Sequence, residues 1–434
     1  MGRLPVFYPK TRNNALIGVY SRSKDHMDAT EKRIMDQVDS QRDDLIEFYR
    51  ELVRCESLTG HELGVANALV DGLAKRGYTD VEIVGPAPDR PNVLGYLRGV
   101  EEGPTYYFNG HLDVITPGDV SEWEHAPFSA DYEDGKIYGR GTVDMKSGTF
   151  SSFFAGLILN QLGIPLRGKV VFTGVCDELK SGNDGVLWLL KEGYIKKERD
   201  DDFGINCEPT DMTEMCMSTK GIYRAKFTVQ GKGAYNARPY LGINAIDKAA
   251  DLIKAINDYD KRIKVRTHPL LAPPTVCVAM IEGGEATNTV PDRCVLTVTR
   301  RMLPNETLEQ VFAEYDEIIA DLKAKDPEFS CTYKECTNFR PPVDNPMDSL
   351  IVRVIRKALK TVTGKDMIQN GSEGGTDASH VVYQTGMTMP NLGPGDYRLL
   401  GTTEEYITAD DFINMIKIYA LSIYYALGLE TQGE

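Results

Sequence analysis

Apolar residues recur at helical spacing near the start of the chain, at Ile34, Val38, Leu45, Phe48 and Leu52. A repeat of about 3.6 residues is typical of an amphipathic helix, so we predict helix from residue 30 to residue 54. Short apolar runs at residues 105–110 and 169–175 predict buried strands, and residues 149–163 predict a helix that ends at Gly163. Strands that alternate with helices favour a mainly parallel sheet with helices on both faces, an α/β fold. Ligands of such sheets bind at loops beyond the carboxyl ends of the strands.

The pattern changes after Lys220, where elements follow in the order β-α-β-β-α-β. Strands are predicted at residues 222–230, 275–281, 294–300 and 329–336, and helices at residues 244–258 and 307–324. This order is the split βαβ arrangement of ferredoxin-like α+β domains. We therefore predict a second domain, residues 221–336, inserted into a first domain that takes residues 29–220 and 337–434. Residues 1–28 are expected to form an N-terminal arm.

Charge and composition exclude some classes of function. The chain has 434 residues, with 49 Lys and Arg against 64 Asp and Glu, and a formal net charge of −15. Such a surface repels phosphate backbones, so no nucleic acid partner is expected. The eight cysteines form no CxxC pair and are interpreted as reduced packing residues, for example Cys277 in an apolar strand. The N-terminus has no long apolar core, so we expect no membrane partner and a cytoplasmic location.

Candidate metal ligands lie where predicted strands end. The segment "GHLDV" presents His111 and Asp113 on one side of a strand, because side-chain direction repeats every second residue. Asp144 lies in a glycine-rich loop before a helix, and Glu178 and Glu208 follow apolar strands. One imidazole with several carboxylates suits a divalent metal. Each residue alone also has a simpler interpretation, as a hydrogen-bonded structural pair, a solvated loop residue or a helix cap.

Taken together, longer segments resemble one known superfamily. They are "NGHLDV", "GRGTVDMKSG", "CDE", "CEPT", "GKGAYNARPYLGINAI", "ATNTVPDRCVLTVTRRMLPNET", "GGTDAS" and "EEYI". The chain is similar, from about residue 40 to its C-terminus, to the metallopeptidase superfamily of carboxypeptidase G, the aminoacylases, and the acetylornithine and succinyl-diaminopimelate deacylases. The resemblance implies a zinc-exopeptidase-like catalytic domain with an inserted lid and dimerisation domain.

The resemblance also implies roles for the candidate residues. In that superfamily two metals share a bridging aspartate, and the ligands of the first metal fall here on His111, Asp144 as the bridge, and Glu208. The general base falls on Glu178. Asp113 is the other expected catalytic residue, placed to orient the imidazole through a hydrogen bond.

The second metal of the superfamily has no ligands of its own in this chain. Its two private ligands fall on Leu179 and Gly401, which cannot coordinate. A shifted alignment would make Asp177 the base and Glu178 a ligand, but Gly401 would still be unable to bind. His380 is the only histidine in the C-terminal segment, and we interpret it as packing or capping a helix. We therefore predict one divalent ion per chain, with manganese preferred and zinc or cobalt as alternatives.

Substrate-binding residues are implied in the same way. Tyr235 occupies the position of a lid histidine that steadies the oxyanion of peptide hydrolysis, and tyrosine carries no positive charge. Asn288 and Arg301 match lid residues that bind a substrate carboxylate, and Gly375 and Thr376 match a substrate-contacting loop. Tyr235 is equally well interpreted as a surface residue, and Arg301 as part of a strand-end ion pair.

These losses favour a single-metal hydrolase that acts on an unusual C–N bond in a small carboxylated substrate. One branch of the superfamily, the 5-nitroanthranilate aminohydrolases, uses one metal and replaces an aromatic amino group with hydroxyl, releasing ammonia. Its substrate stores negative charge on the nitro group, so we predict this activity first. The alternatives are a conventional dipeptidase or N-acyl-amino-acid deacylase with a degenerate second site, and a non-catalytic binding protein. The inserted domain is expected to form a homodimer or a higher homo-oligomer.

Overall fold

The first helical segment consists of two helices, α1 (Ala29–Ser40) and α2 (Arg42–Arg54), instead of the one predicted. Asp28 begins α1 with a capping box that it forms with Glu31. The break at Gln41 (φ −106°, ψ 8°) redirects the chain, so that apolar residues of both helices reach one core. The computed structural model describes residues 28–180 and 182–429, so the arm predicted for residues 1–28 lies, apart from Asp28, outside the described residues.

A five-stranded sheet forms the centre of the larger domain, in the order β1-β2-β6-β3-β7. Its strands are β1 (Val81–Ala87), β2 (Arg90–Arg98), β3 (Glu101–His111), β6 (Arg167–Val175) and β7 (Phe203–Asn206). The strands β6, β3 and β7 are parallel, and β1 and β2 join as antiparallel neighbours. The functional loops follow the carboxyl ends of the three parallel strands, as expected for an α/β sheet.

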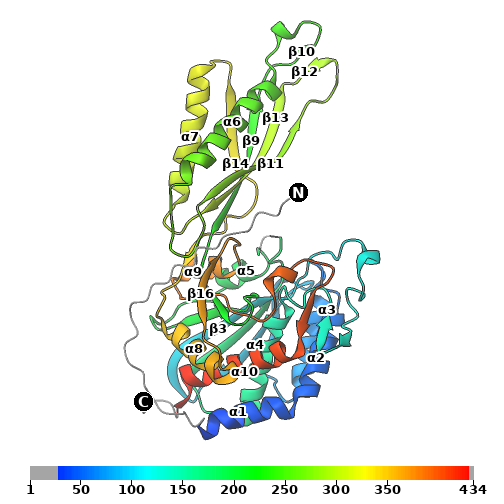
Figure 1. The fold of residues 1–434 in the computed structure, drawn as a ribbon, viewed down its shortest axis with the longest axis vertical. Helices are drawn as coiled ribbons and strands as arrows, with labels where there is room; N and C mark the ends of the chain where they lie inside the picture. The colour runs from blue at the N-terminus through cyan, green and yellow to red at the C-terminus, as the bar shows by residue number, and fades with distance from the viewer. Residues whose placement is uncertain (1–27, 181, 430–434) are drawn as a thin grey trace.

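Helices cover both faces of this sheet (Figure 1). On one side of the sheet lie α3, α4, α8 and α10, with α1 and α2 packed onto these helices, and on the other side lie α5 and α9. Consequently β3 is buried on both sides, with Phe108 in one core and Tyr107 in the other. Besides α1 and α2, these helices are α3 (Leu63–Lys75), α4 (Lys146–Leu162), α5 (Val186–Lys191), α8 (Leu350–Thr363), α9 (Ala378–Thr385) and α10 (Ala409–Leu427). The predicted stop of α4 is confirmed, because Gly163 adopts the left-handed conformation (φ 59°) that ends the helix.

Two small sheets complete the larger domain, in the orders β15-β8-β16 and β17-β5-β4. Their strands are β4 (Tyr132–Glu133), β5 (Lys136–Tyr138), β8 (Glu214–Thr219), β15 (Val343–Asp344), β16 (Ile368–Ser372) and β17 (Tyr406–Thr408). Isolated bridges from Asn391 to Asn206 and Cys216 connect β7 to β8. The C-terminal part of the chain therefore returns to the same domain as the N-terminal part.

The narrower domain projects from the larger one and has its own core (Figure 1). Its sheet is antiparallel in the order β11-β13-β9-β14, with α6 and α7 on one face. The elements are β9 (Gly221–Gln230), α6 (Ala245–Ile263), β11 (Thr275–Gly283), β13 (Arg293–Met302), α7 (Leu308–Lys325) and β14 (Ser330–Glu335), with a distal pair β10 (Ala234–Tyr235) and β12 (Thr289–Val290). The predicted fold class is thereby confirmed. We propose residues 221–336 as the bounds of this lid domain.

One packing prediction is wrong. Cys277 is predicted to be buried, but it is exposed, because its side chain lies on the face of the lid sheet that no helix covers, whereas its neighbour Val276 lies in the core. All eight cysteines are free. Among the described residues, no helix has the length and apolar character needed to cross a membrane.

Candidate metal centre

His111 ends β3 at the carboxyl edge of the central sheet and is almost fully buried. Its Nδ1 lies 2.8 Å from the backbone oxygen of Asp113, and its Nε2 lies 3.1 Å from Oδ1 of Asp144. Thr149 of α4 donates to the backbone oxygen of His111 at 3.0 Å. A side chain at Gly110 would come within 2.3 Å of the same threonine hydroxyl. Glycine at residue 110 therefore lets the helix and the strand end approach closely enough to set the imidazole.

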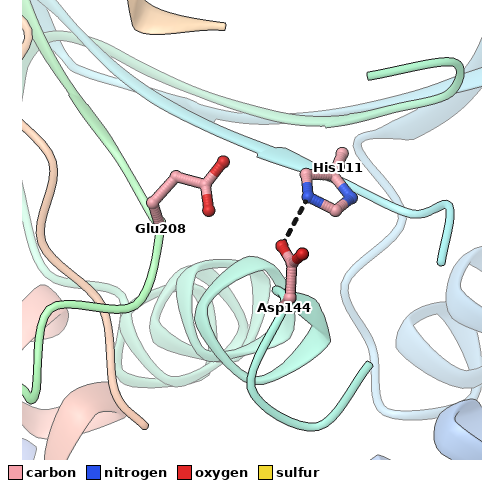
Figure 2. Close-up of side chains that lie close together, drawn as sticks. All are labelled: His111, Asp144 and Glu208. Carbon is pink, nitrogen blue, oxygen red and sulfur yellow. Dashed lines mark hydrogen bonds and ion pairs between the residues drawn. The ribbon is translucent and has the colours of Figure 1, made fainter. Parts of the chain in front are cut away.

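Glu208 follows β7 and completes a group with His111 and Asp144, shown in Figure 2. One potential ligand atom from each residue lies within 4.8 Å of the others, and the described residues contain no other such group. Burial, followed by the charge of Asp144, raises the pKa of Glu208 well above its usual value. Burial lowers the pKa of His111, but the hydrogen bond and charge of Asp144 outweigh it and raise that pKa well above its usual value. Crowded negative charge beside an imidazole fits a divalent cation.

Asp113 joins the strand end to the neighbouring loop. Its carboxylate is fully buried and accepts from the backbone N–H of Glu178 and of Leu179, both at 3.2 Å, and from the hydroxyl of Thr59 at 2.8 Å. Burial raises its pKa to about 6, a direction opposed by the charge of His111. The carboxylate lies 3.5 Å from Nδ1 of His111, farther than the backbone oxygen does. The carbonyl of Asp113 therefore orients the imidazole more directly than its carboxylate.

The two acidic residues after β6 point to different partners. Asp177 has a left-handed backbone (φ 65°) and lies 3.3 Å from Nη2 of Arg90. Glu178 forms an ion pair with Nη1 of Arg340, while Nη2 of Arg340 donates to the backbone oxygen of Glu178 at 2.5 Å. The charge of Glu178 also raises the pKa values of His111 and Glu208. Of these two carboxylates, Glu178 is the one whose charge acts on His111 and Glu208.

The residues in the positions of the second metal's ligands have structural roles. Leu179 donates its backbone N–H to Asp113. Gly401 has a left-handed backbone (φ 76°), and its carbonyl accepts from Nη2 of Arg140 at 3.3 Å. His380 is buried in α9, and burial followed by the charge of Arg340 lowers its pKa to about 4. It does not join the group of His111.

The structure separates the predicted substrate-binding residues into two places. Tyr235 is 62% exposed in β10 and Asn288 is adjacent to β12, both at the distal end of the lid (Figure 1). Within one chain neither reaches the metal group. By contrast, Arg301 donates from Nη1 to the backbone oxygen of Glu373 at 3.2 Å, at the junction of the domains.

The loop predicted to contact substrate shares a contact with Glu178, through Arg340. The carbonyl of Gly375 accepts from Nη1 of Arg340 at 3.0 Å. The hydroxyl of Thr376 donates to the side-chain oxygen of Asn391 at 3.1 Å, which fixes the loop to the larger domain.

Three further residues adjoin the site and were not predicted: Arg340, Asp377 and Tyr397. Arg340 precedes Pro341 and Pro342, so its place in the link between domains was visible in the sequence. Asp377 is 1% exposed, neither carboxylate oxygen has a hydrogen-bond partner among the described residues, and burial raises its pKa to about 8. Burial and the charge of Glu208 raise the pKa of Tyr397. No local pattern distinguishes Asp377 or Tyr397 from ordinary loop residues.

Comparison with known proteins identifies the family. Residues 107–425 match the model of peptidase family M20/M25/M40, and the chain belongs to this family. It is 27% identical over 368 residues to the succinyl-diaminopimelate desuccinylase of Methylorubrum extorquens (strain PA1), covering 82% of this chain and 94% of that protein. Aminopeptidase PepT from Bacillus cereus ATCC 10987 has a similar structure (TM-score 0.69, 23% identity, 88% and 98% of the two chains). So does the Bacillus subtilis YXEP protein, described as a dinuclear metal-binding peptidase (TM-score 0.67, 16% identity, 89% and 99%).

Family and site together define the class of enzyme. The protein is a metal-dependent hydrolase of C–N bonds, and the predictions of the superfamily and of a divalent metal are confirmed.

Proposed function

We propose that the protein is a single-metal hydrolase of a C–N bond in a small carboxylated substrate. The observation that carries this proposal is the single group of His111, Asp144 and Glu208, with Leu179 and Gly401 in the positions of the second metal's own ligands. Manganese is the preferred ion, with zinc or cobalt as alternatives, because the donor set has two carboxylates and one imidazole.

The residues of the metal group and those around it have separate roles in the reaction. A divalent ion held by His111, Asp144 and Glu208 would supply Lewis acidity for the attack of water. Glu178 accepts the proton of that water and returns it to the leaving nitrogen. Asp113 fixes the loop of Glu178 through the two backbone N–H groups that it accepts from.

Cations at the domain junction bind the substrate's carboxylate. Arg301 lies beside the loop of Gly375, and Arg340 contacts both that loop and Glu178. Tyr235 and Asn288 lie at the distal end of the lid, so we propose that they act on the active site of a second subunit. The exposed edge strand β11 supports a homodimer or a higher homo-oligomer.

5-Nitroanthranilate is the first candidate substrate. Attack of water at the carbon that bears the amino group places negative charge on the para nitro group, and ammonia leaves. This reaction needs less oxyanion stabilisation than peptide hydrolysis. In peptide hydrolysis, one hydrogen-bond donor to the oxyanion typically increases the rate by about 100- to 1000-fold. The absence of charge at Tyr235 and of ligands at Leu179 and Gly401 supports this candidate.

Deacylation of an N-acyl amino acid is the second candidate. It is favoured by the likeness to a desuccinylase over 94% of that protein's length. A non-catalytic role is disfavoured, because a complete ligand set and an adjacent base are retained together. We also propose a cytoplasmic location, since free thiols such as the eight found here suit a reducing compartment.

The test is to incubate the protein with manganese and, separately, 5-nitroanthranilate, N-acetyl and N-succinyl amino acids, and dipeptides. Release of ammonia from the nitroarene, with little cleavage of amides, supports the first candidate. Efficient amide cleavage without ammonia release supports the second. Elemental analysis of the same preparation should give one ion per chain, and two tightly held ions would contradict the single-metal proposal.

A further inference from the structure

The lid sheet has one face covered by α6 and α7 and one face without a helix. Alternate residues of β9 from 223 to 229 belong to the core under the helices. Because side chains alternate along a strand, Arg224 and Lys226 lie on the helix-free face. The strand register places Arg301 of β13 and Lys334 of β14 on the same face. We call Arg224, Lys226, Arg301 and Lys334 the cationic lid face.

This face begins at the junction between the lid and the larger domain. Arg301 donates to the backbone of Glu373 in the larger domain. Ile222 pairs with Arg301 in the strand register and packs against the loop of Glu373 and Gly375. A Cβ added to Gly375 would lie 3.2 Å from Cδ1 of Ile222. The carbonyl of the same glycine accepts from Arg340, the guanidinium that pairs with the base. A ligand that extends from the metal group along the lid therefore reaches Arg301 first and the rest of the face next.

Like charges are placed side by side on this face. Lys226 stands directly opposite Lys334, and Arg224 stands opposite Thr299, diagonally next to Arg301. Burial and then the charge of Arg224 lower the pKa of Arg301, so the two guanidinium groups lie near each other. Like charges in such positions destabilise a sheet.

No carboxylate pairs directly with these cations among the described residues, although the charge of Glu373 partly offsets that of Arg301. In the part of the chain that the structure describes, none of the four cations forms an ion pair with Asp or Glu, although the whole chain carries a net charge of −15. Two lysines alone would be an ordinary solvated surface. A partly buried arginine pair without an ion pair, at the junction of the two domains, indicates a position that an anionic ligand group neutralises.

We propose that Arg224, together with Arg301, binds a planar two-oxygen group at the end of the substrate remote from the scissile bond. A guanidinium binds such a group, either a carboxylate or a nitro group that carries transferred charge, through two parallel N–H bonds. Lys226 and Lys334 extend the positive field outward and attract the anion during its approach. The inference rests on the proposed function, because it places the reacting bond at the metal group. It makes Arg224 a residue that selects substrates with a second planar two-oxygen group.

Paired ligands test this selection by calorimetry. Glutarate against butyrate measures the contribution of a second carboxylate, and 5-nitrosalicylate against salicylate measures that of a nitro group. In at least one pair the wild type should prefer the two-group ligand by about 10- to 100-fold, the range of a charge-assisted hydrogen bond. Arg224→Met should abolish that preference, and Arg224→Lys should keep part of it. The pair that shows the effect identifies the chemical source of the group.

A matched control removes the same charge elsewhere on the lid. Lys254→Met on α6 loses an exposed cation that pairs with Asp251, and it should keep the full preference. Thermal unfolding of each variant verifies that it is folded. An equal preference in the wild type and in Arg224→Met, or no preference in either pair, overturns the inference. Turnover separates the two proposals: if no C–N substrate is hydrolysed while Arg224 still governs the preference, the proposed function fails and the binding position stands.

Discussion

The metal centre and the cationic lid face hold their charged groups in opposite ways. At the metal centre, the carboxylate of Asp113 is fully buried and fixed by backbone N–H groups. On the lid, Lys226 and Lys334 are exposed and have no ion pair among the described residues. Groups that move protons or hold a metal need fixed positions, whereas groups that attract a ligand act through water at longer range. Substitutions at the metal centre should therefore change the catalytic rate, and those on the lid should change affinity, specificity and assembly.

The largest effect is expected from His111→Ala. The substitution removes the only imidazole of the group, so bound metal should fall from one ion per chain to nearly none, and activity should fall below detection. Elemental analysis after gel filtration measures the metal, and circular dichroism monitors the fold. Retention of a full equivalent of metal would place the ion elsewhere.

Glu178→Gln should keep the metal and lower kcat by about 10²- to 10⁴-fold, because the amide has the same shape but cannot accept the proton. Asp177→Asn is the matched control, since its carboxylate faces Arg90 and not the metal group. It should retain most activity. The opposite result, an active Gln variant and an inactive Asn variant, would assign the base to Asp177.

Arg340→Met tests the link between the lid and the base. It leaves the buried carboxylate of Glu178 without its partner, so the free energy of unfolding should fall by about 2–4 kcal/mol. Arg340→Lys preserves the charge but loses the second donor, and a smaller decrease is expected. Chemical denaturation of both variants measures the difference. Unchanged stability in Arg340→Met would show that the ion pair contributes little.

The association of subunits is expected to depend on the lid and not on the metal centre. The edge strand β11 exposes Met280 and Ile281, each 54% exposed, and unpaired backbone groups beside them. The wild type should sediment as a homodimer or larger, and Ile281→Glu should weaken the association.

Tyr235→Phe should reduce kcat/KM by about tenfold at most, through loss of one hydrogen bond. A fully active monomer at micromolar concentration would exclude a contribution of Tyr235 to a second subunit.

The smallest effect is expected from Asp377→Asn in metal-free protein. Burial raises the pKa of Asp377 to about 8, above its value in the unfolded chain, so the stability present at low pH is lost as the pH rises towards 8. The asparagine variant lacks this loss and should be more stable than the wild type at pH 7. The two should converge near pH 4. Unfolding curves across this pH range, in chelator, check the sign, and a variant less stable at every pH would contradict it.

Local sequence determined most of the fold. Alternation along β9 and helical spacing in α6 and α7 define which faces are apolar, and this alone predicts the ferredoxin-like lid. The ligand types were also readable, because His111, Asp144 and Glu208 lie at strand ends or in a loop before a helix, within recognisable segments. A residue's place in an element depends on its neighbours in sequence, so such features are visible without the tertiary structure.

Tertiary structure decided how distant groups meet. Arg340 contacts Glu178 across 162 residues, and no local pattern predicts that pair. The same holds for the buried carboxylate of Asp377, whose surroundings come from several loops. The remoteness of Tyr235 from its own metal group and the exposure of Cys277 follow from where the lid projects and which face of its sheet the helices cover. Burial and electrostatics depend on which segments approach one another in space, and sequence spacing does not contain that information.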